Sequence, residues 1–80
     1  MITMSPITII GIKLIKISAV NPTQLEISDN AGISWHLQFK GSLELGNFFH
    51  LGKRNLTVFA RTSEGNFRSV TEGRTWTKVQ

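Results

Sequence analysis

Two short segments of this 80-residue chain repeat one pattern of residues at a distance of 41 positions. SDNAGISW spans residues 28–35 and SVTEGRTW spans residues 69–76. The matching positions hold a serine, a glycine, a hydroxyl residue and a tryptophan: Ser28, Gly32, Ser34 and Trp35 in the first copy, Ser69, Gly73, Thr75 and Trp76 in the second. Self-similarity at about 40–45 residues is typical of four-stranded sheets repeated along a chain. The period predicts one domain over residues 1–80, built from a repeat near 5–41 and a repeat near 42–80.

The composition favours β-strands along the whole chain. There are nine Ile, four Val and eight Thr but three Ala, and β-branched side chains fit a pleated strand better than a helix. Turn-forming stretches recur about every eight to twelve residues, as in an antiparallel meander. They are VNPT, DNAG, KGS, GKRN, SEGN and EGR. No stretch has the apolar stripe of an amphipathic helix, so we expect an all-β chain of seven or eight strands.

Alternation within these stretches predicts which side chains share a face of a sheet. WHLQF at residues 35–39 places Trp35, Leu37 and Phe39 on one face. LTVFAR at residues 56–61 divides its alternate residues between two faces, and the pattern leaves open which face points inward. The apolar run ITIIGIKLIKI at residues 7–17 is interpreted as strand.

The repeated pattern resembles the Asp-box, Ser-x-Asp-x-Gly-x-Thr-Trp, of the BNR (sialidase-type) repeats in β-propellers. The resemblance is closer over residues 45–80 than over residues 7–41, and the acidic position holds Asn30 in one copy and Thr71 in the other. In the family, the glycine takes a positive φ, the polar side chains bond to the turn backbone and the tryptophan covers the hairpin. The resemblance therefore implies a structural role for Ser28, Asn30, Gly32, Ser34, Trp35, Ser69, Thr71, Gly73, Thr75 and Trp76.

Two four-stranded blades are too few to close a propeller ring. A chain of this length also buries only about 60–65% of its unfolded surface, and without cysteine it has no disulfides to compensate. We therefore expect the two blades to complete a propeller by homo-oligomerisation, with a trimer of six blades favoured over a dimer or tetramer. A small monomeric antiparallel sandwich or barrel with two Asp-box hairpins is the alternative.

The sequence lacks the residue patterns of an enzyme. It contains no tyrosine, the nucleophile of the sialidases that share the Asp-box, and its five carboxylates are scattered without an acid–base pair. Neither a nucleophile elbow nor a glycine-rich phosphate loop is present. His36 and His50 lie 14 residues apart without a carboxylate at ligand spacing. We expect a non-catalytic protein with no metal and no other cofactor.

The net charge of +4 lies wholly within residues 46–80. A basic half attracts glycans with acidic groups, nucleic acid or an acidic protein, and it also serves as a solvated surface. Small oligomeric propellers include lectins, so the resemblance implies a glycan bound at blade or inter-subunit clefts. Nucleic acid or an acidic protein partner is the alternative. The candidate ligand contacts are Phe48, His50, Phe59, Arg61 and Arg68, and the candidate basic patch is Lys53, Arg54, Arg74 and Lys78.

The apolar run near the N-terminus does not have the properties of a membrane segment. It is too short to span a bilayer, and Lys13 and Lys16 interrupt it. It also lacks the basic segment before it and the small-residue cleavage site after it that a signal peptide needs. We expect no membrane partner and, by default, a cytoplasmic location.

Overall fold

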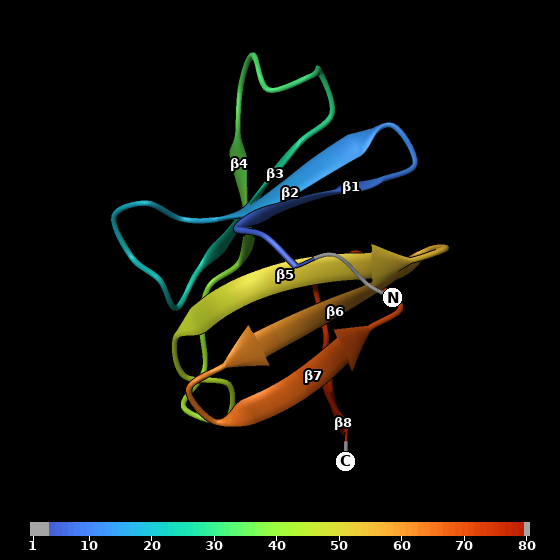
Figure 1. Ribbon diagram of the computed structural model, residues 1–80. Coiled ribbons are helices and arrows are strands. Elements are labelled where there is room, and N and C mark those ends of the chain that lie inside the picture. The colour runs from blue at the N-terminus through green and yellow to red at the C-terminus, as the bar shows by residue number, and fades with distance from the viewer. Residues whose placement is uncertain (1–3, 80) are drawn as a thin grey trace.

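The computed structural model describes residues 4–79, which form two four-stranded antiparallel sheets and no helix (Figure 1). The first sheet consists of β1 (Ile7–Ile10), β2 (Lys13–Ile17), β3 (Leu25–Ser28) and β4 (His36–Phe39). The second consists of β5 (Phe48–Arg54), β6 (Thr57–Thr62), β7 (Gly65–Ser69) and β8 (Thr77–Val79). In both sheets the strands are neighbours in chain order. The prediction of an all-β chain with seven or eight strands is confirmed, with eight strands.

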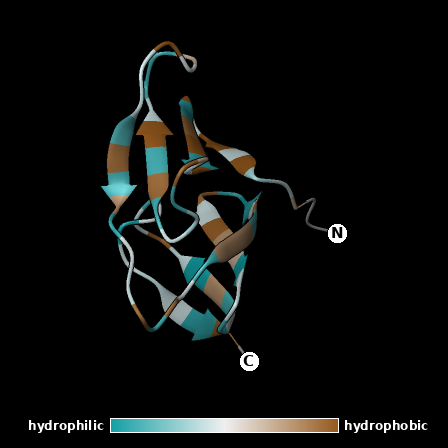
Figure 2. Ribbon diagram, turned by 90° about the vertical axis from the view of Figure 1, so that its left-hand side faces the viewer, coloured by the Kyte–Doolittle hydropathy of each residue, from teal (hydrophilic) through white to brown (hydrophobic). Residues whose placement is uncertain are grey.

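The two sheets stack on each other and share one hydrophobic core (Figure 1). The buried core residues are Ile10, Ile15, Leu25, Leu45, Phe48, Leu51, Val58, Ala60 and Phe67. Hydrophobic and hydrophilic residues alternate along the strands (Figure 2), because successive side chains of a strand point to opposite faces and only one face of each sheet meets the core. The segment before β1 is held to the second sheet by paired backbone hydrogen bonds of 2.8 and 2.6 Å between Ser5 and Leu51.

The apolar run at residues 7–17 forms two strands, as interpreted from the sequence, and a turn divides them into a hairpin. Gly11 and Ile12 make a two-residue turn between β1 and β2, with Gly11 at a φ of 61°. Glycine reaches this conformation without steric cost, and it begins the tight turns that join antiparallel strands. Ile12 is 83% exposed, and its apolar character concealed the turn in the sequence.

A register shift changes the orientation of residues in β4. Leu37 lies opposite Glu26 and Phe39 lies opposite Leu25. Since Leu25 and Glu26 are consecutive, their side chains and those of their partners point to opposite faces. The predicted common face for Leu37 and Phe39 is therefore wrong: Phe39 packs against the core, and Leu37 is 58% exposed. An extra residue on one strand of a pair re-aims the side chains that follow it.

Strand register assigns the remaining residues to faces, because directly opposed residues point to the same side of a sheet. The inner face of the first sheet carries Ile10, Ile15, Ile17, Leu25, Ile27 and Phe39, and its outer face carries Ile7, Ile9, Leu14, Lys16, Glu26 and Leu37. The inner face of the second sheet carries Leu51, Val58, Ala60 and Phe67, and its outer face carries His50, Gly52, Arg54, Phe59, Arg61, Asn66 and Arg68.

The two sheets stack head to tail. When the repeats are aligned on their first hairpin turn, Leu14 corresponds to Val58 and Ile15 corresponds to Phe59. Val58 is on the inner face of the second sheet, whereas Leu14 is on the outer face of the first. Ile15 and Phe59 show the opposite arrangement. The inner face of the second sheet is thus equivalent, position by position in the repeats, to the outer face of the first sheet.

Candidate functional site

The first repeated turn is closed by its own side chains. Ser28 Oγ accepts hydrogen bonds from the backbone N–H groups of Gly32 at 2.8 Å and Asn30 at 3.3 Å. Asn30 Oδ1 accepts a hydrogen bond from the N–H of Ser34 at 3.0 Å and one from the Ser28 hydroxyl at 2.8 Å. These bonds satisfy backbone groups in a loop where Ala31 and Gly32 have φ values of 62° and 88°.

The second repeated turn has the same network. Ser69 Oγ accepts from the N–H of Gly73 at 2.9 Å, and Thr71 Oγ1 accepts from the N–H of Thr75 at 2.9 Å. The Thr71 hydroxyl also lies 3.2 Å from the hydroxyl of Ser69 and 2.8 Å from that of Thr75. Glu72 and Gly73 have φ values of 61° and 90°. A neutral oxygen at the position that is acidic in the Asp-box is therefore sufficient to close both turns.

The two tryptophans follow these turns at equivalent positions but have different neighbours. The Trp76 ring lies between the sheets, with its centroid 6.4 Å from that of Phe39 and 5.6 Å from that of Phe48. Trp35 lies on the outer face of the first sheet, where the Lys16 ammonium group is 4.3 Å from its ring centroid. One tryptophan therefore joins two sheets, and the other belongs to a face that the same chain leaves open.

Four of the five predicted ligand contacts lie together on the outer face of the second sheet. Phe59 is directly opposite Arg68, and Arg61 is directly opposite His50. Phe59 is half-buried, and the other three are exposed. The same face carries Arg54, and none of the four strands of this sheet contains an acidic residue. The face is consequently a basic surface that includes the half-buried Phe59 ring.

Phe48, the fifth predicted ligand contact, is a core residue. It is 3% exposed, and its ring centroid lies 5.8 Å from that of Phe39 and 5.6 Å from that of Trp76. A register shift in β5 between Phe48 and His50 separates the faces of these two residues. The prediction of Phe48 as a ligand contact is wrong, because the bulge shifts the alternation of β5 by one residue and turns this side chain into the core.

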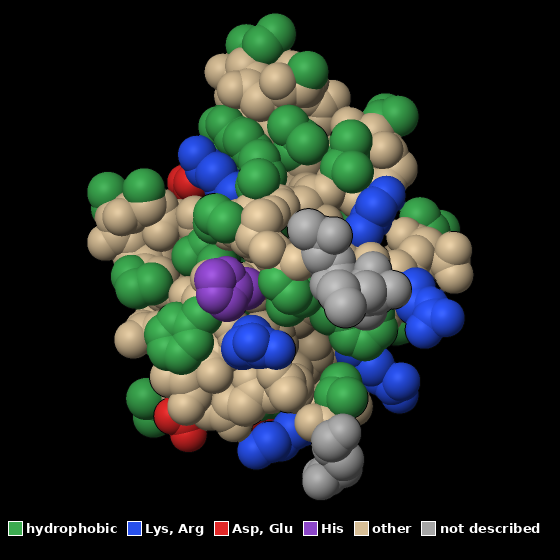
Figure 3. Space-filling view, viewed as in Figure 1, with side chains coloured by type: hydrophobic (Ala, Val, Ile, Leu, Met, Phe, Trp, Pro, Cys, Tyr) green, Lys and Arg blue, Asp and Glu red, His purple; other side chains and the backbone are tan. Residues whose placement is uncertain are grey.

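The four residues predicted as a basic patch do not form one surface. Arg54 is on the outer face of the second sheet, whereas Lys53 points to the opposite side. Lys78 is also on that opposite side, where its ammonium group lies 6.0 Å from the ring centroid of Phe67. Arg74 belongs to the second repeated turn. Figure 3 accordingly shows Lys and Arg side chains scattered over the molecule, at the upper left, along the right-hand rim and over the lower half. The predicted single patch is wrong, because the pleat separates neighbours in sequence.

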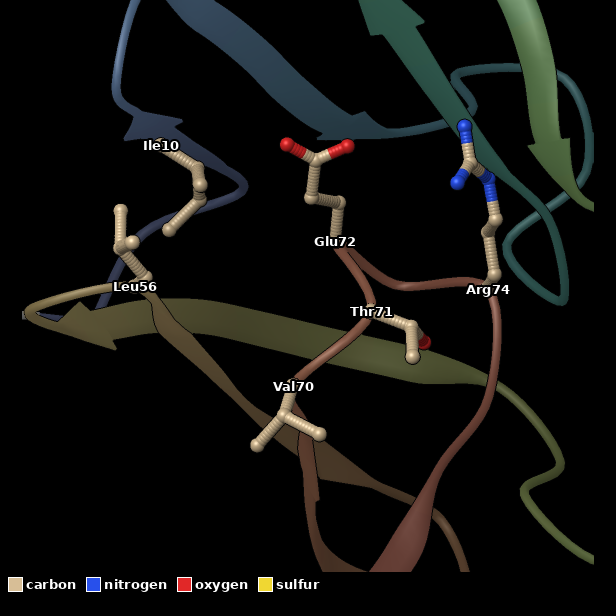
Figure 4. Close-up of a pocket in the computed structure, with 6 residues that line it drawn as sticks. All are labelled: Ile10, Leu56, Val70, Thr71, Glu72 and Arg74. Carbon is tan, nitrogen blue, oxygen red and sulfur yellow. The ribbon is translucent and has the colours of Figure 1, made fainter.

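A pocket of about 290 Å³ opens between the sheets at the end that carries the second repeated turn. Its lining residues are Ile10, Leu56, Val70, Thr71, Glu72 and Arg74. In Figure 4 the side chains of Ile10 and Leu56 lie together on one side, and those of Glu72 and Arg74 extend toward the first sheet. The volume is at the lower end of the range for small-molecule sites.

Polar contacts between the sheets border this pocket. Lys13 Nζ lies 3.3 Å from Glu72 Oε1, and Gln38 Nε2 donates a hydrogen bond of 3.0 Å to the Glu72 carbonyl oxygen. A second pocket of about 150 Å³ lies beside them and is lined by Lys13, Ile27, Asp29, His36, Gln38 and Arg74. Lys13 and Glu72 are 59 positions apart, so no local pattern in the sequence relates them, and the sequence predicted neither residue at this site.

No family model, curated protein or solved structure matches this chain. The resemblance to Asp-box repeats therefore stays a prediction drawn from the residues themselves. Within residues 4–79, no three His, Asp or Glu side chains are grouped so that they could hold a metal ion. The same residues include no helix with the length and apolar character needed to cross a membrane.

Proposed function

We propose that this protein is a non-catalytic binding module that holds single-stranded nucleic acid on the outer face of its second sheet. The observation that carries the proposal is the grouping of Arg54, Arg61 and Arg68 around Phe59 on one open face whose strands contain no carboxylate. Guanidinium groups bind phosphate through paired hydrogen bonds. The Phe59 ring is half-buried, and its solvent-facing part offers a surface on which any base can stack.

The geometry of the face suits an extended ligand. Arg54, Phe59 and Arg61 occupy successive rows across the strands, and rows two residues apart are separated by about 7 Å. Gly52 lies directly opposite Phe59, so no side chain from that strand covers the flank of the ring. Arg61 and Arg68 are diagonal neighbours at about 7–8 Å, and a phosphate between them would offset their mutual repulsion.

A glycan in the pocket between the sheets is the second candidate function. Apolar Ile10 and Leu56 face charged Glu72 and Arg74 across a volume of about 290 Å³. An apolar surface with a few directed polar groups is the usual lining of a small-ligand site. This candidate corresponds to the cleft binding that the family resemblance implies.

Binding of a fluorescently labelled single-stranded oligonucleotide, measured by anisotropy at several salt concentrations, tests the first candidate. Three phosphate contacts predict a slope of log K against log salt of about −2. Affinity should therefore fall about 20-fold when salt rises from about 50 to about 200 mM. Arg61→Gln and Arg68→Gln should each reduce the magnitude of the slope by about 0.7, and Phe59→Leu should weaken binding with little change in slope.

Lys78→Gln is the matched control, because it removes the same charge from the opposite side of the sheet. If this variant reduces the slope as much as Arg68→Gln does, the outer face is not the binding surface. Absence of binding at low salt, together with salt-independent binding to a neutral glycan, would reject nucleic acid in favour of the second candidate.

A further inference from the structure

The outer face of the first sheet is apolar, although a single chain leaves it open. Ile7, Ile9 and Leu37 are 42%, 45% and 58% exposed, and Leu14 and Trp35 are half-buried on the same face. Figure 3 shows hydrophobic side chains gathered over the first sheet in the upper half of the molecule. Exposed apolar side chains gathered on one face of a small domain mark an interaction site.

This face has the build of a surface that packs against another sheet. In the head-to-tail arrangement, it corresponds to the inner face of the second sheet. Leu51 and Val58 occupy the positions equivalent to Ile7 and Leu14, and both are fully buried beneath the first sheet. In the second repeat, the equivalent face is therefore already covered by the first sheet.

The outer face of the second sheet is poorly suited to pack against the apolar outer face of the first sheet. A head-to-tail ring would place that face of a neighbouring copy on the outer face of the first sheet. Within one chain, the inner face of the first sheet covers the second sheet with Ile17 and Ile27. The equivalent positions on the outer face of the second sheet hold Arg61 and Arg68. Enclosing two guanidinium groups against isoleucine and leucine side chains carries a large desolvation penalty. The charge of this face disfavours the ring that the sequence predicted.

The charges on the apolar face instead suit a second copy of the same face. Lys16 and Glu26 lie directly opposite each other on the two central strands, with Lys16 Nζ 3.7 Å from Glu26 Oε1. About a two-fold axis close to this pair, each Lys16 can face the Glu26 of the other copy, as a self-complementary interface requires. The pair leaves the face without net charge on a chain of +4, so two copies approach with least repulsion through it.

We propose that a second copy of this chain covers the outer face of the first sheet and forms a two-fold symmetric dimer. The basic outer faces of the two second sheets then point away from each other and remain accessible. Four strands of about four residues have a projected footprint of about 280 Å², so the interface is smaller than a standard one. Even with exposed Ile12 and Ile33 in the turns at one end of this sheet, the dimer should be weak and should depend on protein concentration.

Sedimentation equilibrium of the full chain from about 1 µM to about 1 mM tests the proposal. The mass should rise from monomer to dimer with concentration, and Ile9→Glu should raise the Kd at least about tenfold by placing a charge in the apolar face. Leu43→Glu is the matched control, because Leu43 is 99% exposed in the connection between the sheets. Far-UV circular dichroism shows whether each variant is folded. A constant monomer mass, or assembly that Leu43→Glu weakens as much as Ile9→Glu, would overturn the proposal.

A charge exchange distinguishes the dimer from the ring. Lys16→Glu and Glu26→Lys each give the face one sign of charge, so each variant alone should associate more weakly than the parent chain. An equal mixture of the two should recover association, because every charge then meets its opposite across the two-fold axis. In a head-to-tail ring, Lys16→Glu would face Arg61 and Arg68 of a neighbour and would strengthen assembly. That result, or a mass approaching three chains, would refute the symmetric dimer.

Discussion

Replacing each repeated tryptophan by alanine separates the contribution of the turn from that of the contact between sheets. Trp35 and Trp76 follow turns with the same hydrogen-bond network, but Trp76 Nε1 also donates a hydrogen bond of 2.9 Å to the Gly73 carbonyl oxygen of its turn, which Trp76→Ala removes as well. Trp76→Ala also removes the ring contacts with Phe39 and Phe48 that connect the two sheets. Trp35→Ala removes the contact with the Lys16 ammonium group instead.

The difference in the free energy of unfolding follows from these contacts. Aromatic pairs contribute about 0.5–1.5 kcal/mol each beyond their buried area, so the two pairs of Trp76 contribute about 1–3 kcal/mol. A cation–π contact at an accessible site contributes about 0.5–1 kcal/mol. Trp76→Ala should lower the free energy of unfolding by about 3–5 kcal/mol, and Trp35→Ala should lower it by about 1–2 kcal/mol less.

Urea unfolding followed by far-UV circular dichroism measures both changes, at a protein concentration too low for copies to associate. A difference of this size corresponds to about 5–15 °C in Tm for a chain of 80 residues. Trp76→Phe and Trp35→Phe retain part of the buried surface and provide the comparison if Trp76→Ala does not fold. Equal losses at the two positions, or a larger loss at Trp35, would refute the assignment of Trp76 to the contact between sheets.

Two further predictions concern the repeated turns. Thr71→Ala removes the oxygen that accepts the Thr75 N–H and should lower the free energy of unfolding by about 1–2 kcal/mol in urea unfolding, whereas Thr71→Ser keeps the oxygen and should cost less than half of that. Gly73→Ala should lower the free energy of unfolding by about 1–2 kcal/mol, because Gly73 has a φ of 90°. Gly32, with a φ of 88°, should show about the same loss on substitution by alanine, and thermal unfolding measures both variants. The nearest atom to an added methyl group on Gly73 is Leu25 Cδ1 at 3.5 Å, so a much larger loss at Gly73 than at Gly32 would show that contact rather than backbone strain sets the cost.

Short-range features were readable from the sequence because their causes act over a few residues. Strand content follows from β-branched side chains, and both repeated turns follow from polar groups that bond to backbone close by. Ser28 and Ser69, for example, each accept from an N–H four positions away. Local alternation predicted the wrong face where a strand pair contains a bulge. The bulges in β4 and β5 place Leu37 and Phe48 on other faces than simple alternation predicts.

The sequence by itself determined an all-β chain, two repeats and the turns that close them. Only the tertiary structure decided which face of each sheet is covered, because burial depends on segments distant along the chain, and a strand pattern is the same whether its apolar side meets a neighbour or solvent. Leu14 and Val58 are equivalent in the repeats, yet the head-to-tail stacking leaves Leu14 on an open face and buries Val58. The same stacking brings Lys13 to Glu72 across 59 positions and separates one basic face from one apolar face.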